Sequence, residues 1–281
     1  MTSQISHLSS LDILKYPRTP HLQGSRLQAG DHNDCVPYER LAGRHIVVEE
    51  KLDGANSALS FSAGGGLLLQ SRGHYLAVDQ MGGRERQFNA FKQWARAHES
   101  ALLSRLEDRY VMYGEWLYAK HSVFYDALPH WFAEFDLWDR SRACFLDTPG
   151  RHALLADLPV VSVPVLYSGV APRRIKDLLA MIAPSLGRSV HWRAQFEQAV
   201  QRQGLDLALC WRQTDPSDCA EGLYIKVEEN GQTLERYKFV RSDFVQVILN
   251  SGSHHSERPI VPNGLRDGVD LFAGTISKQW R

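Results

Sequence analysis

The hydrophobic residues of this chain fall mostly into short runs of the length that β-strands have. Such runs cover residues 45–50, 56–62, 67–72, 110–116, 131–138, 160–166, 221–228 and 234–240. Turn residues at 64–66 (GGG) and at Asn230-Gly231 separate two pairs of these runs, which predicts two β-hairpins. Pro164 lies inside another run and predicts an edge strand or the end of a strand.

A second spacing predicts helices. Over residues 84–107 apolar side chains recur every three or four positions, which predicts one long helix with a single buried face. Shorter helical runs cover 173–183 and 193–203. Because the strands are more numerous and pair as hairpins, the pattern predicts an α+β fold of antiparallel β-sheets flanked by helices.

The composition is that of an ordinary globular protein. The chain has 281 residues, of which 43% are hydrophobic and 23% are charged, so it can bury a large core without staples. Lys and Arg number 32, as do Asp and Glu, which excludes a polybasic protein but leaves room for a local basic patch. The most basic long stretch contains Arg173, Arg174, Lys176, Arg188, Arg193, Arg202 and Arg212. This stretch suits either a contact with a phosphate backbone or a solvated helix face.

Targeting signals are missing from the sequence. The polar residues at the N-terminus do not resemble a signal peptide, and no stretch approaches the roughly 18 consecutive apolar residues of a membrane span. The cysteines form no C-x-x-C pair, so neither a zinc ribbon nor a disulfide framework is predicted. We therefore expect a cytoplasmic protein with no membrane partner.

The strongest chemical signal is the segment 51–56 (KLDGAN). Lys51 follows a predicted strand and precedes a turn, so its amine projects from a strand end. A lysine amine is a nucleophile only when it is deprotonated, which requires a pKa lowered by burial or by nearby cations. Taken alone, such a segment is more often a simple turn than a catalytic site.

Further motifs follow Lys51 in a fixed order. They are Ser71-Arg72-Gly73, Tyr113-Gly114-Glu115-Trp116, Glu134-Phe135-Asp136, residues 221–226 (EGLYIK) and Arg236-Tyr237-Lys238. Over roughly residues 46–241 this series resembles the covalent nucleotidyltransferase superfamily of ATP-dependent ligases and capping enzymes. The segment 114–129, followed by Phe135-Asp136, is most similar to RNA ligases of the RNA ligase 2 type.

The resemblance implies a fold and a reaction. It implies a nucleotidyltransferase (ATP-grasp-like) domain over 1–245 and a short extension over 246–281, with no OB-fold. ATP and Mg²⁺ or Mn²⁺ would be required, and Lys51 would be the catalytic residue that carries AMP. The AMP would pass to an RNA 5′-phosphate, which a 3′-hydroxyl would then attack.

The resemblance also implies a nucleotide site. Its residues would be Glu50, Asp53, Asn56, Arg72, Glu115, Phe135, Lys226, Arg236 and Lys238, with Glu221 holding the metal through water. Phe135 would stack on adenine, although its alternation with Trp131, Ala133 and Leu137, taken alone, is more typical of a core residue.

Two of these assignments conflict with strand geometry or with the family pattern. Arg236 and Lys238 would share a face, neutralise the triphosphate and depress the pKa of Lys51, but the family usually has lysine where Arg236 stands. Lys226 follows Glu221 by five residues, so strict alternation places it on the other face of the strand.

The partners implied are RNA with 5′-phosphate and 3′-hydroxyl ends, and an end-healing or RNA-binding protein. With few residues after 241 for gripping RNA, we expect the chain to seal RNA slowly by itself. The alternatives are a DNA ligase, a capping-type nucleotidyltransferase, or a non-catalytic module that binds nucleotides or RNA ends. Lys120, His121 and Asp136 carry no assigned step.

Overall fold

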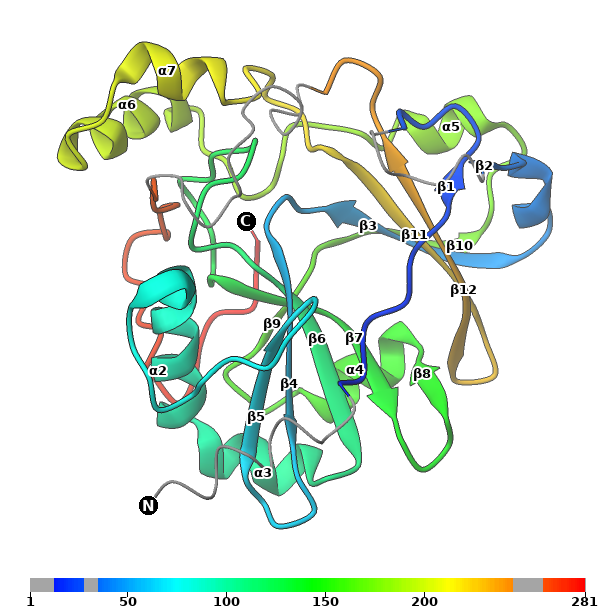
Figure 1. Ribbon diagram of the computed structural model, residues 1–281. Coiled ribbons are helices and arrows are strands. Elements are labelled where there is room, and N and C mark those ends of the chain that lie inside the picture. Colours follow the sequence, from blue (N-terminus) through cyan, green and yellow to red (C-terminus); the bar gives the residue numbers. More distant parts are fainter. Residues whose placement is uncertain (1–12, 28–34, 245–259, 281) are drawn as a thin grey trace.

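One continuous, mostly antiparallel sheet organises the computed structural model, which describes residues 13–27, 35–244 and 260–280 (Figure 1). Its strand order is β10-β3-β11-β12-β8-β7-β6-β4-β5, and β1, β2 and β9 attach to this path. Helices flank the sheet, as the sequence predicted.

The strands are β1 (His21–Leu22), β2 (Cys35–Val36), β3 (His45–Lys51), β4 (Ala55–Phe61), β5 (Leu67–Ser71), β6 (Tyr110–Trp116), β7 (Phe132–Asp139), β8 (Cys144–Leu146), β9 (Val161–Ser162), β10 (Val165–Val170), β11 (Gly222–Glu229) and β12 (Gln232–Val240). The helices are η1 (Tyr38–Leu41), η2 (Gly83–Phe88), α2 (Asn89–Ala97), α3 (Glu99–Leu106), α4 (Thr148–Leu154), α5 (Ile175–Leu179), α6 (Trp192–Arg202) and α7 (Leu207–Arg212).

The sheet has two halves that run in different directions. In Figure 1, β3 crosses the view, whereas β4, β5 and β6 run down it. Strands β10, β3, β11 and β12 form the first half, β7, β6, β4 and β5 form the second, and β8 pairs with β12 on one side and β7 on the other. The chain passes between the halves directly after Lys51, where β3 ends and a short turn leads into β4.

The first half has one apolar face and one polar face. Ile46, Val48 and Ile225 are buried in the core that η1 and α5 cover. Because side chains alternate along a strand, Lys51 and Tyr224 lie on the opposite face, which is turned toward the second half.

The predicted helix over 84–107 is broken in two, so the expectation of a single long helix was wrong. Helix α2 ends at Ala97, and His98 leaves helical geometry before α3 begins. His98 is buried, and its Nε2 lies 3.0 Å from the carbonyl oxygen of Leu271. The break therefore coincides with a tertiary hydrogen bond, while apolar residues of both helices, such as Trp94 and Leu102, still pack in one core.

The apolar run over 160–166 forms two short strands rather than one. Strand β9 pairs with β7 in parallel, and β10 pairs with β3 in antiparallel. Pro164 lies between them and its carbonyl accepts a hydrogen bond from the Glu50 N–H at 3.1 Å. The two predicted hairpins and the predicted helices near 175 and 192 are confirmed.

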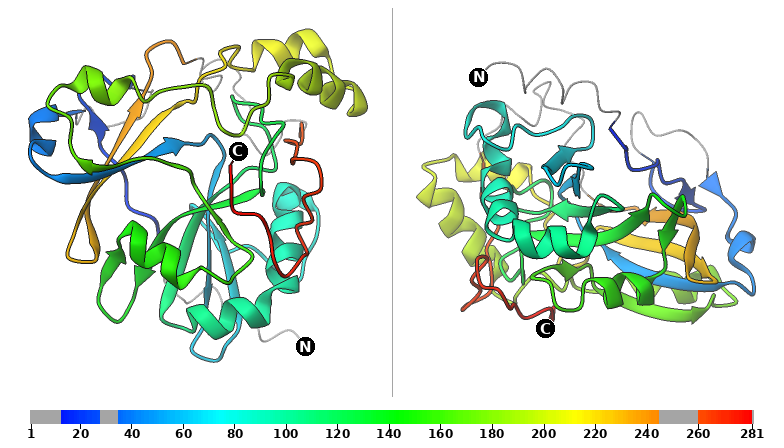
Figure 2. Two further views of the ribbon diagram at one scale, coloured as in Figure 1. Left: turned by 180° about the vertical axis from the view of Figure 1, so that it is seen from behind. Right: turned by 90° about the horizontal axis from the view of Figure 1, so that it is seen from below.

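Residues 260–280 pack along the body of the molecule (Figure 2). Trp280 is buried, and its indole N–H donates to the carbonyl of Ser162 at 2.8 Å. The predicted boundary between 245 and 246 lies outside the described residues. None of the described helices combines the length and apolar character needed to cross a membrane.

Candidate active site

Lys51 lies at the crossover between the two halves of the sheet. It pairs with Gly222 across β3 and β11, and this pairing brings the preceding Glu221 beside it. Lys51 Nζ donates a hydrogen bond to Glu221 Oε2 at 2.7 Å. At Gly54 a Cβ would lie 2.7 Å from the Trp116 carbonyl oxygen, so the turn after Lys51 can pass against β6 only with glycine there.

Carboxylates surround Lys51 and set its protonation. Burial disfavours its charged form, but the carboxylates of Glu221, Glu115 and Asp53 outweigh burial and raise the pKa of Lys51 above its ordinary value. The expectation that neighbouring cations depress the pKa of Lys51 was therefore wrong for the ligand-free chain. The lysine is held protonated until the surrounding negative charge is balanced.

The two nearest carboxylates are themselves destabilised by crowding. Burial raises the pKa of Glu115 to about 8, despite the nearby Lys51, and Asp53 and Glu221 add to the rise. Burial likewise raises the pKa of Glu221 to about 7, and Lys51 and Lys238 oppose this shift. The Glu115 carboxylate also accepts a hydrogen bond from the Gly54 N–H at 3.0 Å. Burial thus favours the neutral form of both carboxyls, and positive charge beside them would favour their ionised form.

Asp53 anchors a neighbouring loop. One of its carboxylate oxygens accepts hydrogen bonds from the N–H groups of Ser122 and Val123 at 2.6 and 2.8 Å. The N–H of Asp53 donates to the Tyr125 hydroxyl at 2.8 Å. These contacts fix the segment around His121, whose Nδ1 lies 4.0 Å from the Asp53 carboxylate.

Glu50 anchors a second loop with its side chain. Its carboxylate accepts hydrogen bonds from the Ser185 hydroxyl at 2.5 Å and from the Leu186 N–H at 3.0 Å. The side chain is buried and already engaged by this loop, so it is not available to a ligand.

Phe135 lies at a β-bulge. The pairing of β6 with β7 shifts between Tyr113 and Gly114, and Phe135 is the extra residue. Alternation therefore fails there: Phe135 packs with Ala133, whereas Leu137 belongs to a different core. The expectation that Phe135 and Leu137 share a face was wrong.

Two tyrosines accompany Phe135. The Tyr16 ring lies edge-on at 5.0 Å between centroids, and the Tyr224 ring is inclined by 33° at 6.4 Å. The Tyr16 hydroxyl contacts Asp136 and lies 2.7 Å from the Tyr224 hydroxyl, which lies 2.8 Å from the Thr19 hydroxyl. The N-terminal segment thereby crosses from one half of the sheet to the other.

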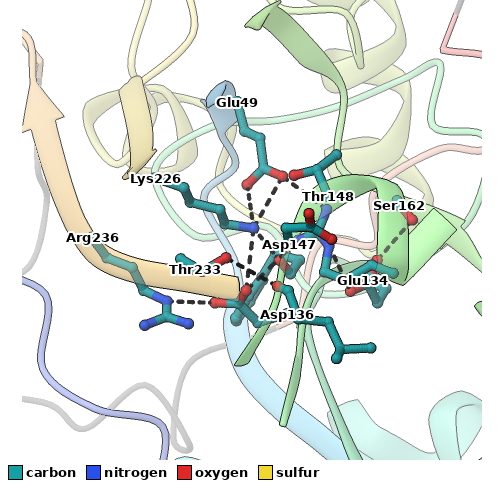
Figure 3. A network of polar contacts seen from close by, with 12 residues as sticks. Glu49, Glu134, Asp136, Asp147, Thr148, Ser162, Lys226, Thr233 and Arg236 are labelled. Atoms are coloured by element: carbon teal, nitrogen blue, oxygen red, sulfur yellow. Dashed lines mark hydrogen bonds and ion pairs between the residues drawn. The ribbon is translucent and has the colours of Figure 1, made fainter. Parts of the chain in front are cut away.

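A buried network of charged residues joins the two halves farther along the same face (Figure 3). Lys226 Nζ lies 3.0 Å from Glu49 and 3.3 Å from Asp136, and it also donates to the Phe135 carbonyl. Arg236 Nε donates to Asp136 at 2.8 Å. Together the cations keep the pKa of Asp136 well below its usual range despite its burial.

Arg151 of α4 completes this network. Its guanidinium lies 2.9 Å from Glu49, 3.5 Å from Glu134 and 3.8 Å from Asp136, and all four side chains are fully buried. The carboxylates thus come from β3 and β7, and the arginine bridges them.

The network accounts for Lys226 and Arg236. Both lie on the face that carries Lys51, so the alternation argument that separated Lys226 from the site was wrong, since Glu221 precedes the strand. Lys226 nevertheless pairs with Val47, four residues from Lys51, which is about 13 Å along a strand. The structure therefore brings Glu221 to Lys51 and places Lys226 and Arg236 in the ion network instead.

The other predicted residues lie near the ends of their strands. Asn56 pairs with Glu115 across β4 and β6, and Arg72 is exposed directly after β5. Lys238 pairs with Tyr224 and shares the Lys51 face. Lys120 instead donates to the backbone carbonyls of residues 121 and 213.

Sequence reasoning missed Tyr16, Tyr224 and Arg151. Tyr224 lies inside a quoted motif, and its alternation with Lys226 was the available signal. Tyr16 lies in a proline-containing segment that reads as a loop, and Arg151 is a basic residue on a short helix, so neither carries a local signal.

The residues beside Lys51 fit a hydrated divalent cation better than a closed metal cage. Within the described ranges, no group of three or more His, Cys, Asp or Glu side chains is arranged to enclose a metal. Carboxylate oxygens are the donors that Mg²⁺ favours, and it commonly keeps several waters and one or two carboxylates. Glu221 and Glu115 would provide such donors in their ionised forms, and a bound cation would offset the burial that raises their pKa values.

Comparison with known proteins identifies the family. No curated protein matches the chain. Among solved structures it is similar to variants of the Naegleria gruberi RNA ligase with ATP and Mn, at 19% and 18% identity and TM-scores of 0.46 and 0.47, with 72% and 79% of this chain covered. It spans 51% and 58% of those chains, so about half of their length. The family model for RNA ligase matches residues 44–240, from the start of β3 to the end of β12, and the chain belongs to the RNA ligase family.

Proposed function

We propose that this chain is an ATP-dependent RNA ligase with a nucleotidyltransferase fold, which joins 3′-hydroxyl and 5′-phosphate RNA ends through AMP carried on Lys51. The observation that supports it most is the 2.7 Å ion pair between Lys51 and Glu221 at the junction of the two halves of the sheet. A lysine at this position belongs to no core. It lies among carboxylates at a strand end, where a nucleotide can approach it.

The proposed reaction begins at Lys51 Nζ. Its deprotonated amine attacks the α-phosphorus of ATP, so that a P–N bond forms, the bond to the bridging oxygen breaks, and pyrophosphate leaves. The AMP then passes to an RNA 5′-phosphate, as the P–N bond is replaced by a P–O–P linkage. Attack by a 3′-hydroxyl forms the phosphodiester bond and releases AMP.

The charges around Lys51 define what its activation requires. Glu115, Asp53 and Glu221 favour the ammonium form, so the amine becomes available only when their charge is balanced. A divalent cation held by Glu221, with Lys238 nearby, would supply positive charge here and at the phosphates. The similar Naegleria structures contain ATP and Mn, which supports ATP as the co-substrate and a divalent metal as the cofactor.

Phe135 and Tyr224 form the proposed adenine site. Their ring centroids lie 6.4 Å apart, one ring in each half of the sheet, and the ring planes are inclined by 33°. Stacked bases are about 3.4 Å apart, so two rings that enclose a base need about twice that separation. A small opening of this gap would admit adenine, and base stacking contributes about 1–3 kcal/mol.

Two other functions are compatible with the same pocket. A DNA ligase or a capping-type enzyme would use the same lysine, and a binding module would keep the pocket without chemistry. The RNA ligase family match favours RNA as the substrate. Ends of other chemistry would first need an end-healing partner.

The test is a joining assay with labelled substrates. The purified chain receives ATP or GTP and either an RNA or a DNA strand with a 5′-phosphate and an acceptor with a 3′-hydroxyl. We expect ATP-dependent joining of RNA, and no joining by Lys51→Ala. Preferential joining of DNA, transfer of GMP, or equal activity of Lys51→Ala would each contradict the proposal.

A further inference from the structure

A cavity of about 610 Å³ lies beside helix α6, away from Lys51. Its walls include Phe124, Asp126, Ser189, Ala199, Arg202 and residues 262–267. Figure 1 shows α6 at one edge of the molecule, near the start of the C-terminal segment. The volume of the cavity falls within the roughly 300–1,000 Å³ that is usual for small-ligand sites, so the cavity can hold a nucleotide.

The lining combines the groups that a nucleotide needs. Phe124, Ala199 and Leu265 supply apolar surface that can meet a base. Arg202 and Arg266 supply guanidinium groups, and neither has a carboxylate partner in the described part of the chain. Arginine is suited to phosphate because its planar fork can bind two oxygens at once.

The acidic residues of the lining do not block this use. Asp126 is engaged by Ser189, whose N–H donates at 2.7 Å and whose hydroxyl also donates. Asp267 is exposed at the rim, where its carboxylate can accept hydrogen bonds from ribose hydroxyls. A 2′-hydroxyl is the group that distinguishes RNA from DNA at a contact of this kind.

The arginines of the basic stretch between residues 171 and 212 lie in different surroundings in the structure. Arg174 pairs with Asp177, and Arg193 pairs with Asp218, both at 2.8 Å. Arg188 is buried and donates to backbone carbonyls. Arg202 instead lines the cavity, so it is the member of the stretch that the fold places at a built site.

One loop connects the cavity with the reactive lysine. The N–H groups of Ser122 and Val123 hold the Asp53 carboxylate, two residues from Lys51. The next residue, Phe124, lines the cavity. Because consecutive Cα atoms are about 3.8 Å apart, the cavity begins within the reach of a short stretch of nucleic acid from Lys51.

We propose that this cavity is a docking subsite for the RNA strand, which binds a nucleotide near the end to be joined through Arg202, Arg266 and the Phe124 surface. The inference rests on the proposed function, since it takes RNA as the substrate. It assigns strand binding to a surface that takes no part in the transfer of AMP to Lys51.

The experiment compares two double variants that lose the same charge. R202Q/R266Q removes the cavity arginines, and R173Q/R212Q removes two exposed arginines outside the cavity. Binding of a fluorescent 5′-phosphorylated single-stranded RNA is measured by anisotropy at several salt concentrations. Transfer of labelled AMP to Lys51 is measured on the same proteins.

We expect R202Q/R266Q to bind the RNA at least tenfold more weakly. Two lost phosphate contacts on a single strand should reduce the slope of log affinity against log salt by about 1.4. R173Q/R212Q should retain most of the affinity, and both variants should accept AMP as the wild type does. Photo-crosslinking of 4-thiouridine near the 5′ end should label peptides that contain Phe124 or Arg202.

Equal RNA binding by R202Q/R266Q and the wild type, or an equal loss in both double variants, would overturn the inference. Crosslinks confined to other surfaces would do the same. If the wild type accepts no AMP, the proposed function fails and this inference fails with it. If the wild type accepts AMP but the cavity variant binds RNA normally, only this inference fails.

Discussion

The contact between Lys51 and Glu221 favours the charged form of the Lys51 amine, and the role proposed for it is open to a direct test. Glu221→Gln keeps the shape of the side chain but removes its charge, so we expect little or no AMP transfer to Lys51 while the circular dichroism stays unchanged. Glu228→Gln is the matched control, because Glu228 is a buried carboxylate at the other end of β11 that accepts from Thr148 at 2.7 Å. Normal AMP transfer by Glu221→Gln would exclude a role for this carboxylate in the reaction.

Substitution of Phe135 tests whether its ring stacks on a ligand or packs in the core. Phe135→Ala should weaken ATP use by about 1–3 kcal/mol, because a base loses its stacking surface. Phe132→Ala is the control, because Phe132 is fully buried on the same strand and its truncation should cost about 3–5 kcal/mol of stability. Melting and the ATP dependence of AMP transfer are measured for both. A Phe135→Ala protein that is strongly destabilised but has an unchanged ATP requirement would return Phe135 to the core.

His130 should make the stability of the fold decrease at acidic pH. Burial lowers the pKa of His130 to about 4, so the folded state keeps it neutral while the unfolded state takes up a proton below about pH 6.5. The unfolded state therefore binds more protons in this window, and the free energy of unfolding falls by about 3 kcal/mol as the pH drops from about 6.5 to 4. Urea unfolding of the wild type and of His130→Gln across this range measures the difference.

His130→Gln should lose less stability than the wild type as the pH falls, because the glutamine amide takes up no proton. His45→Gln, at an exposed position, should follow the wild type. Parallel curves for the wild type and His130→Gln would show that His130 does not cause the acid sensitivity.

Among the elements, helix α4 ties the two halves of the sheet together through Arg151. Arg151→Met leaves the carboxylates of Glu49 and Glu134 buried without their arginine, and breaking a buried ion pair in this way costs about 3–5 kcal/mol. Because Glu49 and Lys51 share β3, the relative position of the halves and the ATP requirement should change as well.

Arg109→Met is the control for Arg151→Met. Arg109 pairs with Asp139 at 2.6 Å at the far end of β7, so its loss should lower the melting temperature without changing the ATP requirement. Both variants are assayed well below their melting temperatures. The role of the network is purely structural if Arg151→Met behaves like Arg109→Met.

The elements that were predicted correctly are those whose sequence signals lie within the element or in the adjoining turn. Both hairpins were predictable because glycine-containing turns separate runs of strand length. The break at His98 and the bulge at Phe135 depend on partners elsewhere, namely Leu271 for the first and strand β6 for the second. Such features were not predictable because they arise only when distant segments pack.

At the scale of the whole molecule, strand register assembles the site. Lys51 lies opposite Gly222, and Asn56 lies opposite Glu115, so motifs far apart in the sequence meet where the halves join. The sequence was sufficient to predict that Lys51 lies at the end of a strand. It did not predict that Lys226 and Arg236 bind buried carboxylates, because those carboxylates come from both halves.

The mass of the intact chain tests the central claim most directly. The purified protein is incubated with ATP and Mg²⁺ or Mn²⁺, and its mass is measured before and after, followed by peptide mapping. The account predicts a mass gain of one AMP, located on Lys51, lost on addition of pyrophosphate and absent from Lys51→Ala. A chain that binds ATP without gaining mass, or an adduct that persists in Lys51→Ala, would contradict it.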